Sequence, residues 1–101
     1  MTIAEFWQVC TSDVPGDELL KNTHLLSLWY DHKGDWEKSH ELIQDLNDHK
    51  AAAIHAYLHR KEGDIWNADY WYRRANAKRK DISLEEEWQV LVEELISQTN
   101  S

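Results

Sequence analysis

The sequence predicts an all-α fold of about five helices, arranged as two helical hairpins followed by a C-terminal capping helix. Three observations lead to this prediction. Apolar residues recur at helical rather than strand spacing. The dipeptide Gly-Asp occurs twice, at 34–35 and 63–64, with matching residues around it. One proline and three glycines supply too few turn signals for a sheet of many short strands.

The composition fits one helical domain that spans residues 1–101. Six tryptophans and four tyrosines supply enough bulky apolar surface for one core, although 30% of the residues are charged. The formal net charge of −8 disfavours binding to nucleic acid or to an anionic membrane. Cys10 is the single cysteine, which excludes a disulfide or a cysteine-based zinc site within one chain.

The first residues carry no pattern typical of export or membrane insertion. Met1 is followed by neither a basic cluster nor a long apolar run. We therefore expect a cytoplasmic protein without a membrane partner.

Residues 1–16 are predicted to form an N-terminal arm, either a short helix or an extended segment. Phe6, Trp7 and Val9 fit neither period decisively. The polar, Pro- and Gly-containing stretch at 12–17 then separates this arm from the first hairpin.

Hairpin 1 is predicted over residues 17–48. Its first helix begins at Asp17, which can cap it, and continues to about Lys33. Gly34 ends this helix, because glycine adopts a left-handed φ without a steric penalty. Asp35 caps the second helix, whose inward positions are expected at Trp36, Ser39, Ile43 and Leu46.

Hairpin 2 is predicted over residues 50–80 on the same pattern. Its first helix covers about 51–62 and stops at Gly63, and Asp64 caps its second helix. The capping helix follows over 83–98, where Ser83 and Glu86 form a capping box. Its apolar stripe has a period of 3.6 and consists of Leu84, Trp88, Leu91, Val92, Leu95 and Ile96.

The two hairpins are related by a shift of 29 residues. Small residues fall on small residues, because Ser27 matches Ala56 and Ser39 matches Ala68. Small residues at these positions let two paired helices approach closely, and larger neighbours fill the groove. The larger matched pairs are Tyr30 with His59, Trp36 with Ile65, and Ile43 with Tyr72.

These matched positions resemble tetratricopeptide and Sel1-like repeats, and the likeness covers about residues 17–80. It implies a right-handed α-α superhelix in which the first helix of each hairpin lines an inner, concave face. The sequence departs from that family in three respects. The period is 29 residues rather than about 34. No proline closes either unit, and His55 stands where an apolar residue is expected.

The segments 33–36, 55–64 and 67–75 are also similar to a family of small bacterial proteins. That resemblance covers about three quarters of the chain. It implies a helical fold and brings no function with it.

The concave face implied by the repeat resemblance supplies the first candidate partner-binding residues. Leu28, Asp31 and His32 come from hairpin 1, and Tyr57, Arg60 and Lys61 come from hairpin 2. The mixed charge of these residues suits a polar peptide segment or a terminal carboxylate. An ordinary solvated helix face remains the alternative interpretation.

Three consecutive aromatic residues supply the second group of candidates. Tyr70, Trp71 and Tyr72 cannot all face one core from a single helix. Tyr72 takes the core position, so Tyr70 or Trp71 must cover the last helix or a partner. The adjacent Arg73 and Arg74 join them as partner-binding candidates.

The basic residues of this region do not indicate a nucleic-acid site. Five positive charges occur within residues 73–80 of an otherwise acidic chain. Cations favour the negative C-terminal end of a helix, and several acidic residues follow closely. We therefore predict no nucleic-acid partner.

The pair His55 and His59 has the spacing i, i+4, so both rings lie on one helix face. This spacing suits two imidazole ligands of one metal ion. The simpler interpretation is a partly buried, hydrogen-bonded ring, and we predict neither a metal nor a cofactor. Both histidines stay among the partner-binding candidates. The residues available as a third ligand are His24, Asp31, His32, His40 and Glu62.

No arrangement of residues indicates an active site. The sequence contains no nucleophile elbow, no phosphate-binding glycine loop and no pair of catalytic carboxylates at a recognisable spacing. The prediction is a protein–protein interaction module without catalytic activity, whose partner is a protein, a peptide or a second copy of the chain. The alternative is a small-molecule or metal-binding protein, with or without enzymatic activity, centred on His55 and His59.

Overall fold

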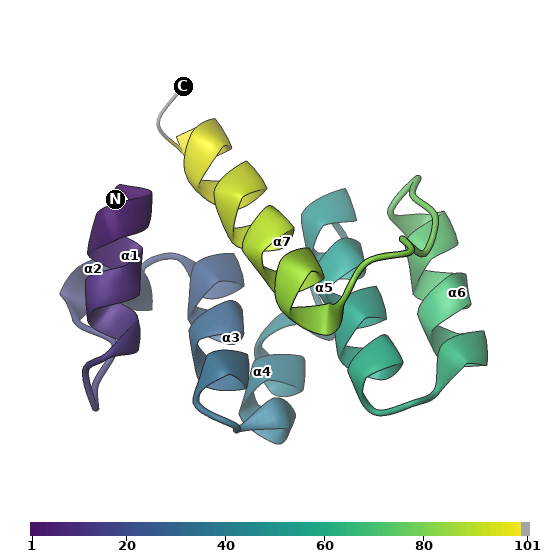
Figure 1. Ribbon diagram of the computed structural model, residues 1–101, viewed down its shortest axis with the longest axis horizontal. Coiled ribbons are helices and arrows are strands. Elements are labelled where there is room, and N and C mark those ends of the chain that lie inside the picture. The colour runs from purple at the N-terminus through teal and green to yellow at the C-terminus, as the bar shows by residue number, and fades with distance from the viewer. Residues whose placement is uncertain (100–101) are drawn as a thin grey trace.

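The computed structural model describes residues 1–99, and within this range the chain forms seven α-helices and no strand (Figure 1). The predicted all-α class is confirmed. The helix number exceeds the expected five because the arm is helical and the first helix of hairpin 1 is divided in two. In chain order the helices are α1 (Ile3–Cys10), α2 (Asp17–Leu20), α3 (Thr23–His32), α4 (Trp36–Ile43), α5 (His49–Lys61), α6 (Ile65–Arg74) and α7 (Leu84–Thr99).

The N-terminal arm is a helix because a capping box starts it. The hydroxyl of Thr2 accepts a hydrogen bond from the amide of Glu5 at 3.1 Å, and the Glu5 carboxylate accepts one from the Thr2 amide at 2.9 Å. Phe6 and Cys10 are the buried residues of α1. This decides between the two alternatives left open for the arm.

A continuous helix from Asp17 to Lys33 was expected, and this expectation is wrong. The first segment, α2, ends after Leu20, and Asn22 caps a new helix by accepting a hydrogen bond from the amide of Leu25 at 3.2 Å. Asparagine is among the best N-cap residues, and its side chain competes with the helix for backbone partners. The local cap therefore interrupts a sequence that otherwise has a helical period.

The two hairpins consist of α3 with α4 and of α5 with α6, and their turns have nearly the same geometry. Gly34 has φ 87° and Gly63 has φ 88°. Asp35 and Asp64 then cap the following helices, each accepting a hydrogen bond from an amide three residues later. The predicted turns are confirmed, and their 29-residue spacing is a repeat of backbone geometry as well as of sequence.

Small residues separate the paired helices, as predicted. The hydroxyls of Ser27 and Ser39 lie 2.8 Å apart, and both side chains are fully buried between α3 and α4. Ala56 and Ala68 occupy the equivalent places between α5 and α6, also without exposed surface. Close helix approach at these positions follows from the small volume of the side chains.

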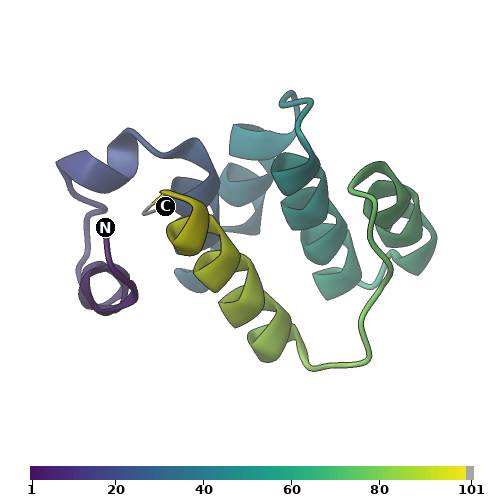
Figure 2. The same cartoon turned by 90° about the horizontal axis from the view of Figure 1, so that it is seen from above.

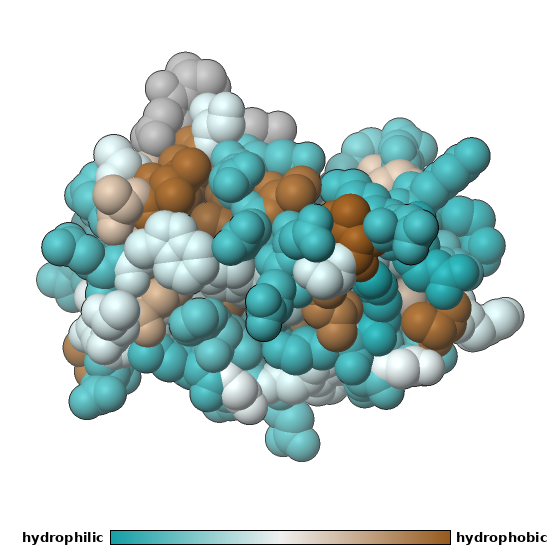
Figure 3. All heavy atoms as spheres, viewed as in Figure 1, coloured by the Kyte–Doolittle hydropathy of each residue, from teal (hydrophilic) through white to brown (hydrophobic). Residues whose placement is uncertain are grey.

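The last helix lies along one side of the hairpins. Figure 2 shows α1 and α7 on the same side of the row formed by α3 to α6, and α7 packs against α5, α3 and α1. Figure 3 shows the hydrophobic surface of this face as separate small patches among hydrophilic residues. The predicted stripe supplies five buried residues to the core: Trp88, Leu91, Val92, Leu95 and Ile96.

The start of α7 is capped by Ser83, whose hydroxyl accepts a hydrogen bond from the amide of Glu86 at 3.1 Å. The same hydroxyl lies 3.2 Å from the Glu86 carboxylate, to which it can donate. Glu85, Glu86 and Glu87 place negative charge in the first turn, where it favours the helix dipole. Among residues 1–99, no helix combines the length and the apolar character that crossing a bilayer requires.

Candidate functional site

The structure brings several of the predicted site residues together at two places. One is a cavity between α1, α3, α5 and the start of α7. The other is a cluster of histidines where the two hairpins meet. We call them the aromatic cavity and the histidine cluster.

The aromatic cavity has a volume of about 500 Å³ and four aromatic rings in its wall, those of Trp7, His32, Tyr57 and Trp88. The ring centroids of Trp7 and Trp88 are 5.3 Å apart, and His32 lies 5.2 Å from Trp88 and 6.2 Å from Trp7. Trp88 is buried, whereas 39% of the Trp7 surface is exposed. The lining residues are Trp7, Asp31, His32, Tyr57, Lys61, Leu84, Glu85, Trp88 and Gln89.

A buried carboxylate forms the polar part of this wall. Asp31 is 2% exposed; it accepts a hydrogen bond from the Tyr57 hydroxyl at 2.7 Å and forms an ion pair with the Lys61 ammonium at 2.9 Å. Burial, reinforced by the neighbouring Asp31 carboxylate, raises the pKa of Tyr57 far above its usual range. The Tyr57 hydroxyl therefore stays protonated and serves as a donor.

Of the six residues predicted for the inner face, Asp31, His32, Tyr57 and Lys61 line the aromatic cavity. Leu28 is buried in the core, and Arg60 is directed to α7 instead. Its guanidinium pairs with the buried Glu87 carboxylate at 2.6 Å and also donates to the main-chain carbonyl of Ile82. Through this ion pair and this hydrogen bond, the Arg60 side chain attaches the start of α7 to hairpin 2.

Glu87 is shared between both hairpin-2 helices, because its second carboxylate oxygen accepts a hydrogen bond from the Tyr72 hydroxyl at 2.6 Å. The pKa of Tyr72 is raised by burial first and then by this carboxylate. The pKa of Arg60 is raised mainly by its hydrogen bond to Glu87. The three side chains form one buried polar network, which the sequence pattern did not reveal.

The aromatic run of α6 points in three directions, as the sequence required. Tyr72 is buried, Trp71 stacks on His55 with a centroid distance of 3.9 Å, and Tyr70 is 39% exposed. Arg74 lies over the rings of Tyr70 and Trp71 at 5.8 and 5.2 Å. Trp71 therefore covers the histidine cluster, not α7. Arg73 is exposed at the end of the same helix.

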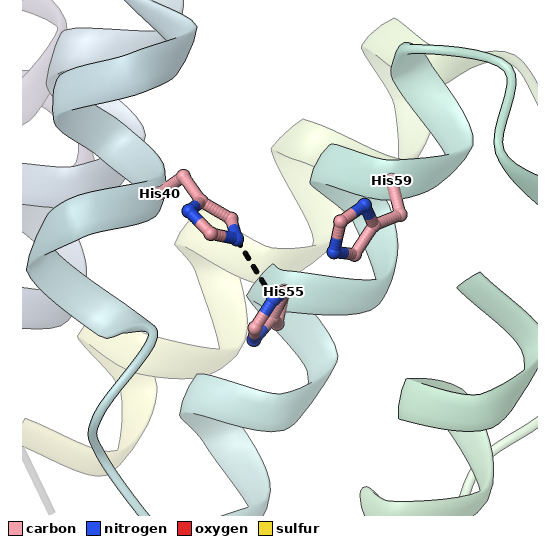
Figure 4. Close-up of side chains that lie close together, drawn as sticks. All are labelled: His40, His55 and His59. Carbon is pink, nitrogen blue, oxygen red and sulfur yellow. Dashed lines mark hydrogen bonds between the residues drawn. The ribbon is translucent and has the colours of Figure 1, made fainter. Parts of the chain in front are cut away.

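The histidine cluster joins the predicted pair to a third ring from the other hairpin (Figure 4). His40 comes from α4, and its Nε2 lies 3.0 Å from the Nε2 of His55 on α5. His59 stacks on His55 one helical turn later, with centroids 4.8 Å apart. His55 and His59 are 5% and 8% exposed, and His40 is half-buried.

Burial sets the charge state of the inner rings. Burial, with the neighbouring rings of His40 and His59 adding to it, lowers the pKa of His55 to about 3. The pKa of His40 is lowered as well, again by burial first. Both rings are therefore neutral at pH 7. Each has one nitrogen that carries a proton and one nitrogen whose lone pair can accept a hydrogen bond.

Indole rings and a carboxylate surround the cluster. Trp36 stacks on His40 with a centroid distance of 4.9 Å, opposite the contact of Trp71 with His55. The Nδ1 atom of His59 lies 2.8 Å from the carboxylate of Glu62. The sequence offers His40 and Glu62 as possible third ligands, and the structure places both of them beside the pair.

Among the cavity residues that sequence reasoning did not assign to a site, Trp7 and Trp88 supply aromatic rings. The signal for Trp7 was the capping box at Thr2 and Glu5, which makes the arm a helix and orders this side chain. Trp88 was assigned to the core stripe alone. Comparison with known proteins gave no match to any family model, curated protein or solved structure.

Proposed function

We propose that this chain is a small, cytoplasmic, non-enzymatic interaction protein of the tetratricopeptide-like kind, which binds an extended protein segment through the aromatic cavity. The observation that carries the proposal is the cavity itself. It combines an exposed Trp7, several aromatic side chains and an ion pair between the buried Asp31 carboxylate and the partly exposed Lys61, at the inner side of two helical hairpins.

The repeat geometry supports the tetratricopeptide-like part of the proposal. Both hairpins turn through a glycine at φ near 88°, cap the second helix with aspartate and seat a small residue at the crossing. Matching positions are 29 residues apart throughout. The free, buried thiol of Cys10 suits the reducing cytoplasm.

The chemistry of the wall defines the ligand. Trp7, His32 and Trp88 offer flat aromatic surfaces that suit one large apolar or aromatic side chain of a partner. Lys61, whose side chain is 39% exposed, offers a cation at the mouth for a main-chain or terminal carboxylate oxygen. A volume of about 500 Å³ is large enough for one anchoring side chain with its flanking backbone.

The position of α7 limits the length of segment that can bind. This helix covers the faces of α3 and α5 that the repeat resemblance assigned to a long groove. A partner therefore has access to the cavity beside α7, with one anchor residue rather than a row of them. We expect micromolar rather than nanomolar affinity, because the buried area at a single anchor is small.

A random peptide library displayed against the purified protein tests the proposal. We expect selected peptides to share a large apolar residue and to bind the wild type in a fluorescence titration. Trp7→Ala and His32→Ala should weaken binding by about tenfold or more, since each removes a wall of the anchor pocket. Light scattering on the same samples detects binding of a second copy instead.

Trp66→Ala is the matched control, because Trp66 is 78% exposed on α6, away from the cavity lining. It should leave peptide affinity unchanged. Selected peptides that bind Trp7→Ala and His32→Ala as well as wild type, or that lose affinity only in Trp66→Ala, would refute the aromatic cavity as the binding site.

A further inference from the structure

We propose that His40, His55 and His59 bind one divalent transition-metal ion, of the class represented by Zn²⁺, through three imidazole nitrogens. The site is separate from the aromatic cavity and lies where α4 of the first hairpin meets α5 of the second. A metal ion there would link the two hairpins directly.

The distances between the rings are close to those of a bound state. The three ligand nitrogens all lie within 4.8 Å of one another, and two of them are already 3.0 Å apart. A zinc ion about 2.0–2.1 Å from each nitrogen, in tetrahedral geometry, separates its ligands by roughly 3.3 Å. Figure 4 shows one nitrogen of each ring facing the space between them. Small side-chain rotations therefore complete the site.

The rings are held in place by the elements that carry them. His55 and His59 project from the same face of α5 one turn apart, a spacing that suits two ligands of one ion. His55 is stacked against Trp71 of α6, and His40 is stacked against Trp36 of its own helix. Side chains that are already ordered lose little rotamer freedom on binding an ion.

The hydrogen bond between Glu62 and His59 is not required by the packing of the helices. The Glu62 carboxylate lies 2.8 Å from Nδ1 of His59, which places the ring proton on Nδ1. The Nε2 atom then keeps its lone pair for the metal ion. A ligating histidine that donates its second N–H to a carboxylate is the usual arrangement around protein-bound zinc. Glu62 is therefore assigned as a positioning residue.

The donor set defines the class of ion. Three neutral imidazoles suit Zn²⁺, Cu²⁺ and Ni²⁺, whereas Ca²⁺ and Mg²⁺ require oxygen ligands. Three protein ligands leave a fourth position for water or an external ligand. His40 is the half-buried member of the cluster, so the ion would enter from its side.

Metal binding must replace the hydrogen bond between His40 and His55. In the metal-free protein the Nε2–H group of one ring donates a hydrogen bond to the Nε2 atom of the other, with 3.0 Å between the two nitrogens. On binding, the donor ring moves its proton to Nδ1, and both Nε2 lone pairs are directed to the ion. The bond is exchanged for two metal–nitrogen bonds, with no net loss of a proton from the neutral pair.

Titration of chelator-treated protein with Co²⁺ tests the site. We expect one equivalent to produce the intense visible absorption of low-coordinate Co²⁺ and to quench tryptophan fluorescence, because Trp36 and Trp71 flank the rings. Zn²⁺ should displace the Co²⁺ and raise the melting temperature, with a further rise for each tenfold increase in free Zn²⁺. A weak, purely octahedral Co²⁺ spectrum or a stoichiometry well above one would overturn the proposal.

Three substitutions locate the ion. His40→Gln and His59→Gln should abolish the absorption band, and His40 is the preferred position because it is half-buried and tolerates change. Glu62→Gln should weaken binding by about 10–100-fold while keeping the band. His49→Gln is the matched control, because His49 is exposed and outside the cluster, and it should change nothing.

Other outcomes contradict the three-histidine site. Loss of the band in Glu62→Gln, with His40→Gln unaffected, would place the ion at the neighbouring group of His59, Glu62 and Asp64. Equal weakening by His49→Gln would indicate unspecific surface binding. Trp7→Ala should leave metal binding intact, which separates this result from any failure of the peptide-binding proposal.

Discussion

The indole nitrogen of Trp88 donates a hydrogen bond to the main-chain carbonyl of Leu28 at 3.0 Å, across 60 positions in the sequence. The same ring packs on Phe6 of α1 with a centroid distance of 5.8 Å. One side chain therefore joins the first helix, the first hairpin and the last helix. It also forms part of the wall of the aromatic cavity.

Replacement of this ring should lower stability strongly. Trp88→Ala should cost about 3–5 kcal/mol of unfolding free energy, because it leaves a large void in the core. Trp88→Phe should cost less, roughly 1–3 kcal/mol, since it keeps most of the ring and loses the hydrogen bond. Urea unfolding followed by circular dichroism measures both. Trp66→Ala, at an exposed position, should change stability by no more than about 0.5 kcal/mol.

Removal of the charge on Glu87 should also be costly. Glu87 is only 2% exposed and pairs with the Arg60 guanidinium. Glu87→Gln therefore leaves this guanidinium without its buried carboxylate partner. Breaking a buried pair from one side costs about 3–5 kcal/mol, and the partial exposure of Arg60 places this variant near the lower limit. Glu85→Gln, on the same helix but exposed, serves as the control. Equal denaturation midpoints for the two variants would contradict a stabilising network around Glu87.

The two hairpin turns should respond alike to substitution. Gly34 and Gly63 have φ values of 87° and 88°, and a Cβ atom at either site meets no atom within 4 Å. The cost of Gly34→Ala or Gly63→Ala is therefore backbone strain alone, about 1–2 kcal/mol each. Gly34→Asn should cost less, since asparagine tolerates the left-handed region. Thermal unfolding of the variants checks this, and a much larger loss at one glycine would contradict the equivalence of the turns.

The metal-free protein should lose stability as the pH falls below about 6.5. The pKa of His55 is about 3 in the folded chain against an ordinary 6.5, so the unfolded state binds the proton first. This contribution is fully present above pH 6.5 and is lost progressively between pH 6.5 and 3. The slope for one such proton is about 1.4 kcal/mol per pH unit.

His55→Gln removes the titrating group and isolates this effect. The rings of His40 from α4 and His59 from α5 lie beside His55, and Trp71 of α6 stacks on it. Beyond these contacts, the Glu62 carboxylate pairs with His59 and Arg74 lies over Trp71. Between pH 6.5 and 5 the wild type should lose about 2 kcal/mol more than the variant, in chelator-treated samples. Parallel pH dependences of the two proteins would show that His55 titrates normally when folded.

Local sequence signals predicted most of the helical framework. The Gly-Asp turns are correct, and α5 begins two residues before the expected position and ends one residue before it. Such signals act within a few residues, so they are readable without knowledge of the tertiary fold. The interruption at Asn22 was missed because an N-cap within a helical period is decided by competition between local and continuous hydrogen bonding.

The candidate sites were only partly predictable, because they depend on contacts between distant segments. The i, i+4 pair His55 and His59 was visible in the sequence, but the choice of His40 among several available residues required the packing of α4 on α5. Buried charge at Asp31 and Glu87 was equally hidden. An acidic residue is normally exposed. Only the fold supplies the tyrosine hydroxyl and the cationic side chain that donate hydrogen bonds to each of these two buried carboxylates.

The placement of α7 has a consequence for how the chain folds. In a linear array of helical hairpins each unit touches only its neighbours, so units can form and melt one after another. Here the last helix contacts α1, α3 and α5 at once, and its core residues belong to the same cluster as those of the first helix. The apolar residues that α3 and α5 contribute to this cluster are therefore covered in part by α7. Loss of that helix would therefore melt the described chain in a single cooperative step rather than shorten it by one unit.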